Sequence, residues 1–227
     1  MYTMSAGYKK KSRSFDIISI ITAISIALCL ISLSVKIVIN ANYLYYYDID
    51  HLNIVETAGM SKSVIKENYD LLMKYMNNNN VTELSLPDFP MSPQGKEHFA
   101  EVKVLFNDIT YLFYGTLALS TLGIIASIVK KKAKVFKASS IIMILIPIIL
   151  AIPFAVDFNG AFTVFHKLAF SNDFWEFDPA SDPIINALPE NYFMHCAVGI
   201  LLLVTLFSIL SYLVSRILKK RFSRSAY

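Results

Sequence analysis

The basic stretch "KKKAKVFK", Lys130–Lys137, decides the fold because it joins two long apolar runs through only eight residues. The flanking runs, about Ile109–Val129 and Ala138–Val156, are each long enough to cross the hydrocarbon core of a bilayer as a helix. Two further runs, about Ile17–Ile39 and Phe193–Val214, have the same character. Hydrophobic residues make up 55% of the 227 residues, too many for an ordinary soluble domain. The sequence therefore predicts an all-α integral membrane protein with four transmembrane helices.

The basic residues gather on one side of the four predicted spans. Fourteen of the 21 Lys and Arg residues precede the first span, follow the fourth or join the second to the third, together with a single acid, Asp16. The positive-inside rule then predicts cytoplasmic segments 1–16, 130–137 and 215–227, and outer segments 40–108 and 157–192. The two outer segments are expected to form an extracytoplasmic cap. This topology, with anionic membrane phospholipid as a partner, explains the net charge of +4, so we expect no nucleic-acid partner.

The sequence contains no recognisable motif for a metal or a cofactor. It has no glycine-rich phosphate loop, no HExxH and no GxSxG. Its two cysteines, Cys29 and Cys196, lie at depths in their spans that differ by roughly 10 Å, which is too far for a disulfide. We therefore expect two buried thiols, no metal site and no cofactor.

The first outer segment contains an aromatic cluster and a predicted amphipathic helix. The cluster "NYLYYYD", Asn42–Asp48, is typical of an interfacial belt, where rings meet lipid and hydroxyls meet water. In "SKSVIKENYDLLMKYM", Ser61–Met76, a capping serine precedes residues at helical spacing: Ile65, Tyr69, Leu72 and Met76. A further helix is expected to begin at Gly95 and to run on into the second span.

Ionisable residues avoid the predicted spans and gather at the outer ends of the second and third. A charge at the bilayer centre costs about 2.5–3.5 kcal/mol or more, so such residues need a partner or a function. We single out His98 and His166 as candidate acid/base residues. His98 and Glu101 share a helix face, so the carboxylate could orient the ring. From spacing alone, a solvated or hydrogen-bonded surface role is also open to both, and it fits His51 and His195 well.

A reaction at the outer face has no supply of nucleotide, so it must run downhill without added energy. Transfer of an acyl group from an ester to an amine meets this constraint, because the amide is the more stable product. Its steps need only proton transfers and stabilisation of an oxyanion.

Two motifs at the outer ends of the second and third spans resemble a known family. "SPQGKEHFAEVKVLF", Ser92–Phe106, and "DFNGAFTVFHKLAFSNDFWEFDPASDPIINALPENYF", Asp157–Phe193, resemble the four-span membrane proteins of the lipoprotein intramolecular transacylase family. The resemblance implies an enzyme acting on bacterial lipoproteins whose N-terminal cysteine carries a diacylglyceryl thioether. The implied reaction moves an acyl chain from the glycerol sn-2 oxygen to the α-amine of that cysteine, giving a lyso-form lipoprotein.

The resemblance also implies the site residues. The motif histidines match His98 and His166, which we expect to act as acid and base without assigning either role. Glu101 would orient His98, and Lys103 or backbone amides could steady the oxyanion. Other residues fall on the second motif without individual roles: Asp157, Asn172, Trp175, Asp178 and Asp182. Trp175 and the neighbouring phenylalanines are expected to sit in the interface and to line an acyl-chain groove.

Two other functions are compatible with a four-span chain. A noncatalytic protein could use its outer cap to bind a lipid or a protein partner, and it would need the aromatic and acidic residues but no histidine pair. A small transporter would need buried charges and broken helices near the bilayer midplane, which the predicted spans lack.

Overall fold

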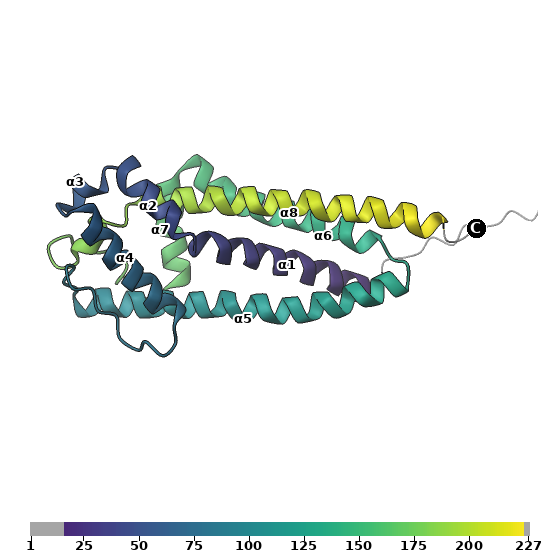
Figure 1. Ribbon diagram of the computed structural model, residues 1–227, viewed down its shortest axis with the longest axis horizontal. Helices are drawn as coiled ribbons and strands as arrows, with labels where there is room; N and C mark the ends of the chain where they lie inside the picture. Colours follow the sequence, from purple (N-terminus) through teal and green to yellow (C-terminus); the bar gives the residue numbers. More distant parts are fainter. Residues whose placement is uncertain (1–15, 225–227) are drawn as a thin grey trace, which may run out of the picture.

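The computed structural model of the protein describes residues 16–224, and all of the regular secondary structure within that range is helical. Four helices are long and apolar enough to cross a membrane: α1 (Ile17–Ile39), α5 (Pro93–Val129), α6 (Lys134–Val156) and α8 (Glu190–Arg224). They run along the long axis of the molecule (Figure 1). The shorter elements gather at one end of this bundle: α2 (Asn42–His51), α3 (Ile54–Ala58), α4 (Lys62–Asn77), α7 (Phe158–Ala169) and the 3-10 helix η1 (Pro183–Asn186). The prediction of an all-α, four-span protein is confirmed.

Helix α1 is the central helix of the bundle. It packs against α5, α6 and α8, and half of its span is buried inside the protein, compared with 17% for each of the other three. Its buried positions are mostly small residues, which allow membrane helices to approach closely. The closest approach is to α5, where a Cβ added at Gly123 would lie 2.4 Å from Oγ1 of Thr22.

Serine side chains connect α6 to α8 inside the bundle. The hydroxyls of Ser139 and Ser211 lie 2.8 Å apart, and the Ser208 hydroxyl donates to the carbonyl oxygen of Ser140 at 2.9 Å. These groups are buried, so hydrogen bonding between the helices satisfies donors that lipid could not.

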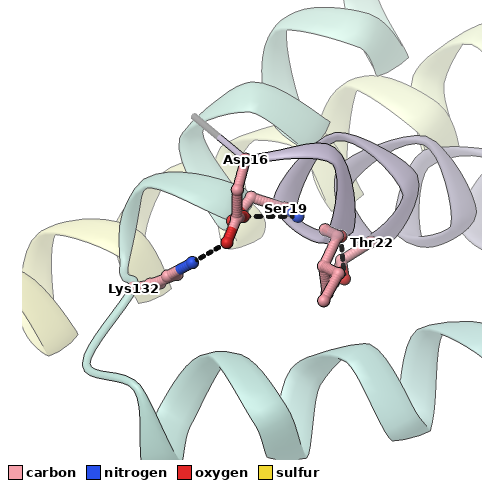
Figure 2. A network of polar contacts seen from close by, with 5 residues as sticks. Asp16, Ser19, Thr22 and Lys132 are labelled. Carbon is pink, nitrogen blue, oxygen red and sulfur yellow. Dashed lines mark hydrogen bonds and ion pairs between the residues drawn. The ribbon is translucent and has the colours of Figure 1, made fainter. Parts of the chain in front are cut away.

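The start of α1 is fixed by a polar contact with the basic turn between α5 and α6. Asp16 caps α1 by accepting from the backbone N–H of Ser19 at 3.0 Å, and it forms an ion pair with Lys132 (Figure 2). Helix α8 ends at the same end of the bundle (Figure 1). The described parts of the three basic segments therefore all lie at the same end of the bundle. The basic residues within 1–15 lie outside the described range.

The opposite end is built around α4. Ser61 caps α4 by accepting from the N–H of Val64, and the four apolar residues predicted to face inward are all buried: Ile65, Tyr69, Leu72 and Met76. The predicted amphipathic helix is therefore confirmed: it begins after the capping serine, as expected, and ends at Asn77.

The aromatic cluster of 42–48 forms α2, and the interfacial prediction is wrong for its central residue. The Tyr45 side chain is fully buried, stacks on Tyr69 with ring centroids 3.7 Å apart, and donates its hydroxyl to the carbonyl oxygen of Ala187 at 2.7 Å. Tyr43 and Tyr47 remain exposed. The helical geometry of α2 explains the difference, because it turns Tyr45 inward while Tyr43 and Tyr47 point outward.

Helix α5 connects the bundle to the end that carries α4. Its 37 residues correspond to about 55 Å at the helical rise of ~1.5 Å per residue, well beyond a ~30 Å hydrocarbon core. It begins at Pro93, two residues before the predicted start, and its first turns project past the end of α1 (Figure 1). Cys29 and Cys196 are buried free thiols, as predicted.

Candidate active site

The two histidines singled out from the sequence meet in space. His98 lies in the projecting part of α5, and His166 lies near the end of α7, the short helix that crosses the end of the bundle (Figure 1). Their ring centroids are 6.0 Å apart, and their exposed fractions are 7% and 8%. Segments separated by two membrane spans thus contribute one buried pair of imidazoles.

The tautomer of His166 follows from its one backbone contact. Nδ1 lies 2.8 Å from the carbonyl oxygen of Phe162, one helical turn earlier. A carbonyl oxygen can only accept, so Nδ1 of the neutral ring donates and Nε2 carries the lone pair. The ring is also packed between aromatic groups, with Phe162 and Trp175 centroids at 4.2 and 4.8 Å. His166 is therefore oriented through Nδ1, and its basic nitrogen, Nε2, makes no hydrogen bond within residues 16–224.

His98 lies in a shell of aromatic rings. The ring centroids of Phe170 and Phe177 lie 4.8 and 5.4 Å from its own, both edge-on, and its Nδ1 is buried with no hydrogen-bond partner among the described residues. Burial lowers the pKa of His98 from 6.5 to about 4, and the neighbouring His166 adds to this effect. Burial also lowers the pKa of His166. Both rings are consequently neutral at pH 7 and able to accept a proton.

A cavity of about 320 Å³ opens beside the two rings. Its walls come from α4, α5, α7, α8 and the loop after α7, and they are mostly apolar. Trp175 lines it, as do Val102 and Phe106 on the bundle side. An apolar space next to paired imidazoles is suited to a lipid chain whose reactive end must reach an acid/base site.

No hydrogen bond joins Glu101 to His98 within the described residues. Its Oε1 accepts a hydrogen bond from the side-chain amide of Asn172 at 2.8 Å, and its Oε2 is buried with no partner among residues 16–224. Asn172 in turn accepts from the backbone N–H of Phe174 at 3.0 Å. Glu101 lies on the same face of α5 as His98, as expected. Its hydrogen-bond partner, Asn172, belongs to the loop after α7. Glu101 therefore connects that loop to α5.

Lys103 is bound away from the histidines. Its ammonium donates to the carbonyl oxygens of Asn78 and Val81, at 3.0 and 2.5 Å, and lies 4.1 Å from the ring centroid of Tyr75. These contacts fix the loop after α4 to α5. No contact joins Lys103 to either histidine within the described residues.

Three of the four aspartates in the second motif hold the local backbone. Asp157 caps α7 by accepting from the N–H of Gly160 at 3.0 Å, and exposed Asp178 accepts from the N–H of Ala180 at 2.9 Å. Asp182 is buried and accepts from the N–H of Ser92 at 2.8 Å. Asp182 thereby joins the two motifs directly, since Ser92 is the cap of α5.

Two polar pairs near the cavity were not predicted. The hydroxyls of Tyr69 and Tyr192, both in the cavity wall, lie 2.7 Å apart. His195 was expected to be a hydrogen-bonded surface residue, and it donates from Nδ1 to fully buried Asp48 at 2.9 Å, which joins α8 to α2. The periodicity of α4 placed Tyr69 inside, but no sequence signal identified its partner.

Comparisons with known proteins agree with this site. The family model described as lipoprotein intramolecular transacylase Lit matches residues 20–193. The solved structure of the membrane integral transacylase Lit from Bacillus cereus is 42% identical, with a TM-score of 0.88 over 91% of this chain and 96% of that one. A variant of that protein with a histidine replaced by arginine is 41% identical, with a TM-score of 0.84 over 92% and 93% of the two chains.

A second variant, with alanine in place of a histidine, is 41% identical with a TM-score of 0.84 over 91% and 94% of the two chains. No curated protein sequence matches the chain. The family match extends over most of the sequence, and the structural likeness extends over nearly all of both chains. The protein is therefore an acyltransferase of the membrane, and it belongs to the lipoprotein intramolecular transacylase Lit family.

Proposed function

We propose that His98 and His166 carry the proton transfers of the transacylase reaction. That reaction moves an acyl chain from the sn-2 oxygen of an S-diacylglyceryl group to the α-amine of the lipoprotein's N-terminal cysteine. The observation that supports the assignment is the meeting of two buried, neutral imidazoles, 6.0 Å apart, beside an apolar cavity. A noncatalytic binder would have no use for such a pair.

The proton balance of the reaction fits this pair. The attacking amine has a reference pKa near 7.7–8.0, so roughly a tenth of it is neutral at pH 7. As nitrogen bonds to the ester carbon, one amine proton passes to a neutral imidazole, for which Nε2 of His166 is oriented. The bond between carbon and the glycerol oxygen then breaks, and that oxygen takes a proton from the imidazolium. The enzyme ends as it began.

The second imidazole of the pair would complete this path. With ring centroids 6.0 Å apart, one imidazole would accept the amine proton and the other would help to protonate the departing glycerol oxygen. The two rings would thus act in sequence on one proton.

The cavity would place the substrate with its glyceryl group at the histidines and an acyl chain between the helices. Substrate lipoproteins are anchored by their lipids, so the glycerol lies at headgroup level. We place the site at the outer face because the basic segments converge on the opposite end of the bundle, where cytoplasmic termini and anionic phospholipid would meet them.

Expression in a host that makes only diacylglyceryl lipoproteins with free amino termini tests the proposal. Mass spectrometry of one lipoprotein's N-terminal peptide should show one acyl chain on nitrogen, one left on glycerol and an unchanged total acyl mass. A free amine on every peptide, despite verified membrane expression, would contradict the assigned reaction and would favour a noncatalytic binder.

A further inference from the structure

Three buried side-chain polar atoms have no hydrogen-bond partner within residues 16–224. They are Nδ1 of His98, Oε2 of Glu101 and Nε1 of Trp175, and all three belong to residues around the histidine pair. An unsatisfied buried polar group costs about 1–3 kcal/mol, so each is expected to meet a partner in the working enzyme. Only Trp175 must be a donor, because an indole N–H cannot accept.

Trp175 is held in place by the structure around it. Its ring lies 4.8 Å from that of His166, with 33° between the planes, and both rings line the cavity. Its loop is joined to α5 by the hydrogen bond from Asn172 to Glu101. The same asparagine accepts from the N–H of Phe174, next to the tryptophan. The orphan donor is therefore fixed before any substrate arrives.

The reaction requires a hydrogen-bond donor at the carbonyl oxygen of the reacting ester. Attack of the amine puts negative charge on the carbonyl oxygen of the sn-2 ester, and a preorganised donor at that oxygen lowers the barrier. Lys103 is bound to loop carbonyls. The hydroxyls of Tyr69 and Tyr192 share one hydrogen bond, which leaves one O–H of the pair as a donor, but no contact joins either ring to a histidine among the described residues. Among these candidates only the indole N–H lies beside a histidine without a partner.

We propose that the indole N–H of Trp175 donates a hydrogen bond to the sn-2 ester oxygen and stabilises the oxyanion that forms there. This inference rests on the proposed function, since it assumes that the ester reacts beside His166. No bond to tryptophan is made or broken. Because the hydrogen bond strengthens as charge develops, its removal should lower kcat far more than it changes KM.

Trp175 is the only tryptophan in the chain, so tryptophan analogues supplied to an auxotrophic host replace this residue alone. In 3-benzothienylalanine sulfur replaces the N–H with nearly the same ring shape, whereas 5-fluorotryptophan keeps the N–H and is the matched control. Each purified protein would be assayed on a synthetic diacylglyceryl lipopeptide in mixed micelles, with the melting temperature recorded to verify folding.

We expect the benzothienyl protein to lose about 10² in kcat, as when one oxyanion donor is removed, with KM and the pH dependence of kcat little changed. The fluorotryptophan protein should retain its rate. Equal rates in both proteins would overturn the inference, and so would equal losses in both or a shifted pH profile, which would indicate a packing role. A different outcome tests the proposed function: it would be contradicted if the protein with ordinary tryptophan did not transfer the acyl chain.

Discussion

The imidazoles of His98 and His166 owe their chemistry to the aromatic residues around them. Rings from Phe162, Phe170 and Trp175 exclude water, and this burial lowers the pKa of both histidines. Neutral imidazole is the form that can take a proton from the amine. The aromatic residues therefore set the reactivity of the pair as well as the shape of the cavity.

Replacing either histidine by alanine should slow transacylation by a factor on the order of 10²–10⁴, the usual contribution of a positioned acid or base. The double variant should be little worse than the worse single one, because the two rings act on one proton. His51→Ala, at an exposed histidine, is the matched control and should keep the normal rate. Near-normal N-acylation by a folded His98→Ala or His166→Ala protein would remove that histidine from the mechanism.

The lowered pKa of His98 also predicts how stability depends on pH. Between its folded pKa of about 4 and its unfolded value of 6.5, the unfolded chain binds more protons. The free energy of unfolding should therefore fall as the pH drops through this window, by on the order of 3 kcal/mol in full, and level off below it. In detergent, the melting temperature of the wild type should fall between pH 7 and 5.

His98→Gln should lose most of this pH dependence and keep only the part that comes from other groups, including His166. An unchanged dependence in the variant would show that His98 already titrates near its ordinary pKa in the folded protein.

At the scale of secondary structure elements, the bundle depends on the close contact of α1 with α5. A Cβ at Gly123 would lie 2.4 Å from Oγ1 of Thr22 and 2.7 Å from its Cγ2. Gly123→Ala should therefore push the helices apart and destabilise the protein by about 1–3 kcal/mol, the usual cost of overpacking. Thermal unfolding in detergent would measure the effect.

Gly115→Ala, on the same helix, is the control, because nothing lies within 4 Å of its added Cβ. It should melt at or above the wild-type temperature. Adding Thr22→Ala to Gly123→Ala should recover part of the loss, since it removes two of the three clashing atoms. Equal melting temperatures for the two glycine variants would show that α1 and α5 do not pack closely at Gly123.

The elements and the histidine pair could be predicted, whereas the partners of the polar groups could not. Periodicity and a capping serine located α4, and two motifs located His98 and His166. The contact between Glu101 and Asn172 depends on how two segments fold over the same bundle end, which no local pattern records. For the same reason the sequence does not reveal that Lys103 donates to carbonyl oxygens of the loop after α4. The burial of Tyr45 could not be predicted because an interfacial aromatic belt and a buried aromatic helix have the same composition.

At the scale of the whole molecule, the charge distribution predicts a cytoplasmic end and an outer end. Single cysteines at Asn79 and Ala180, in a cysteine-free background, should react with an impermeant thiol reagent on intact cells, and one at Lys134 should not. All three positions are exposed, whereas Ala133 in the same turn is buried and would be a poor reporter. Labelling at Lys134 with protection at the other two would reverse the orientation and move the site to the cytoplasm.

The most direct test of the account is a crossover measurement on the purified protein. One lipopeptide would carry a ¹³C-labelled sn-2 chain on an ordinary peptide, and a second an ordinary chain on a ¹⁵N-labelled peptide, both in the same micelles. Intramolecular transfer predicts ¹³C label on the nitrogen of the ordinary peptide alone, and label left on glycerol when His98 and His166 are both replaced by alanine. Label on the ¹⁵N peptide, or label remaining on glycerol with the wild type, would contradict the account.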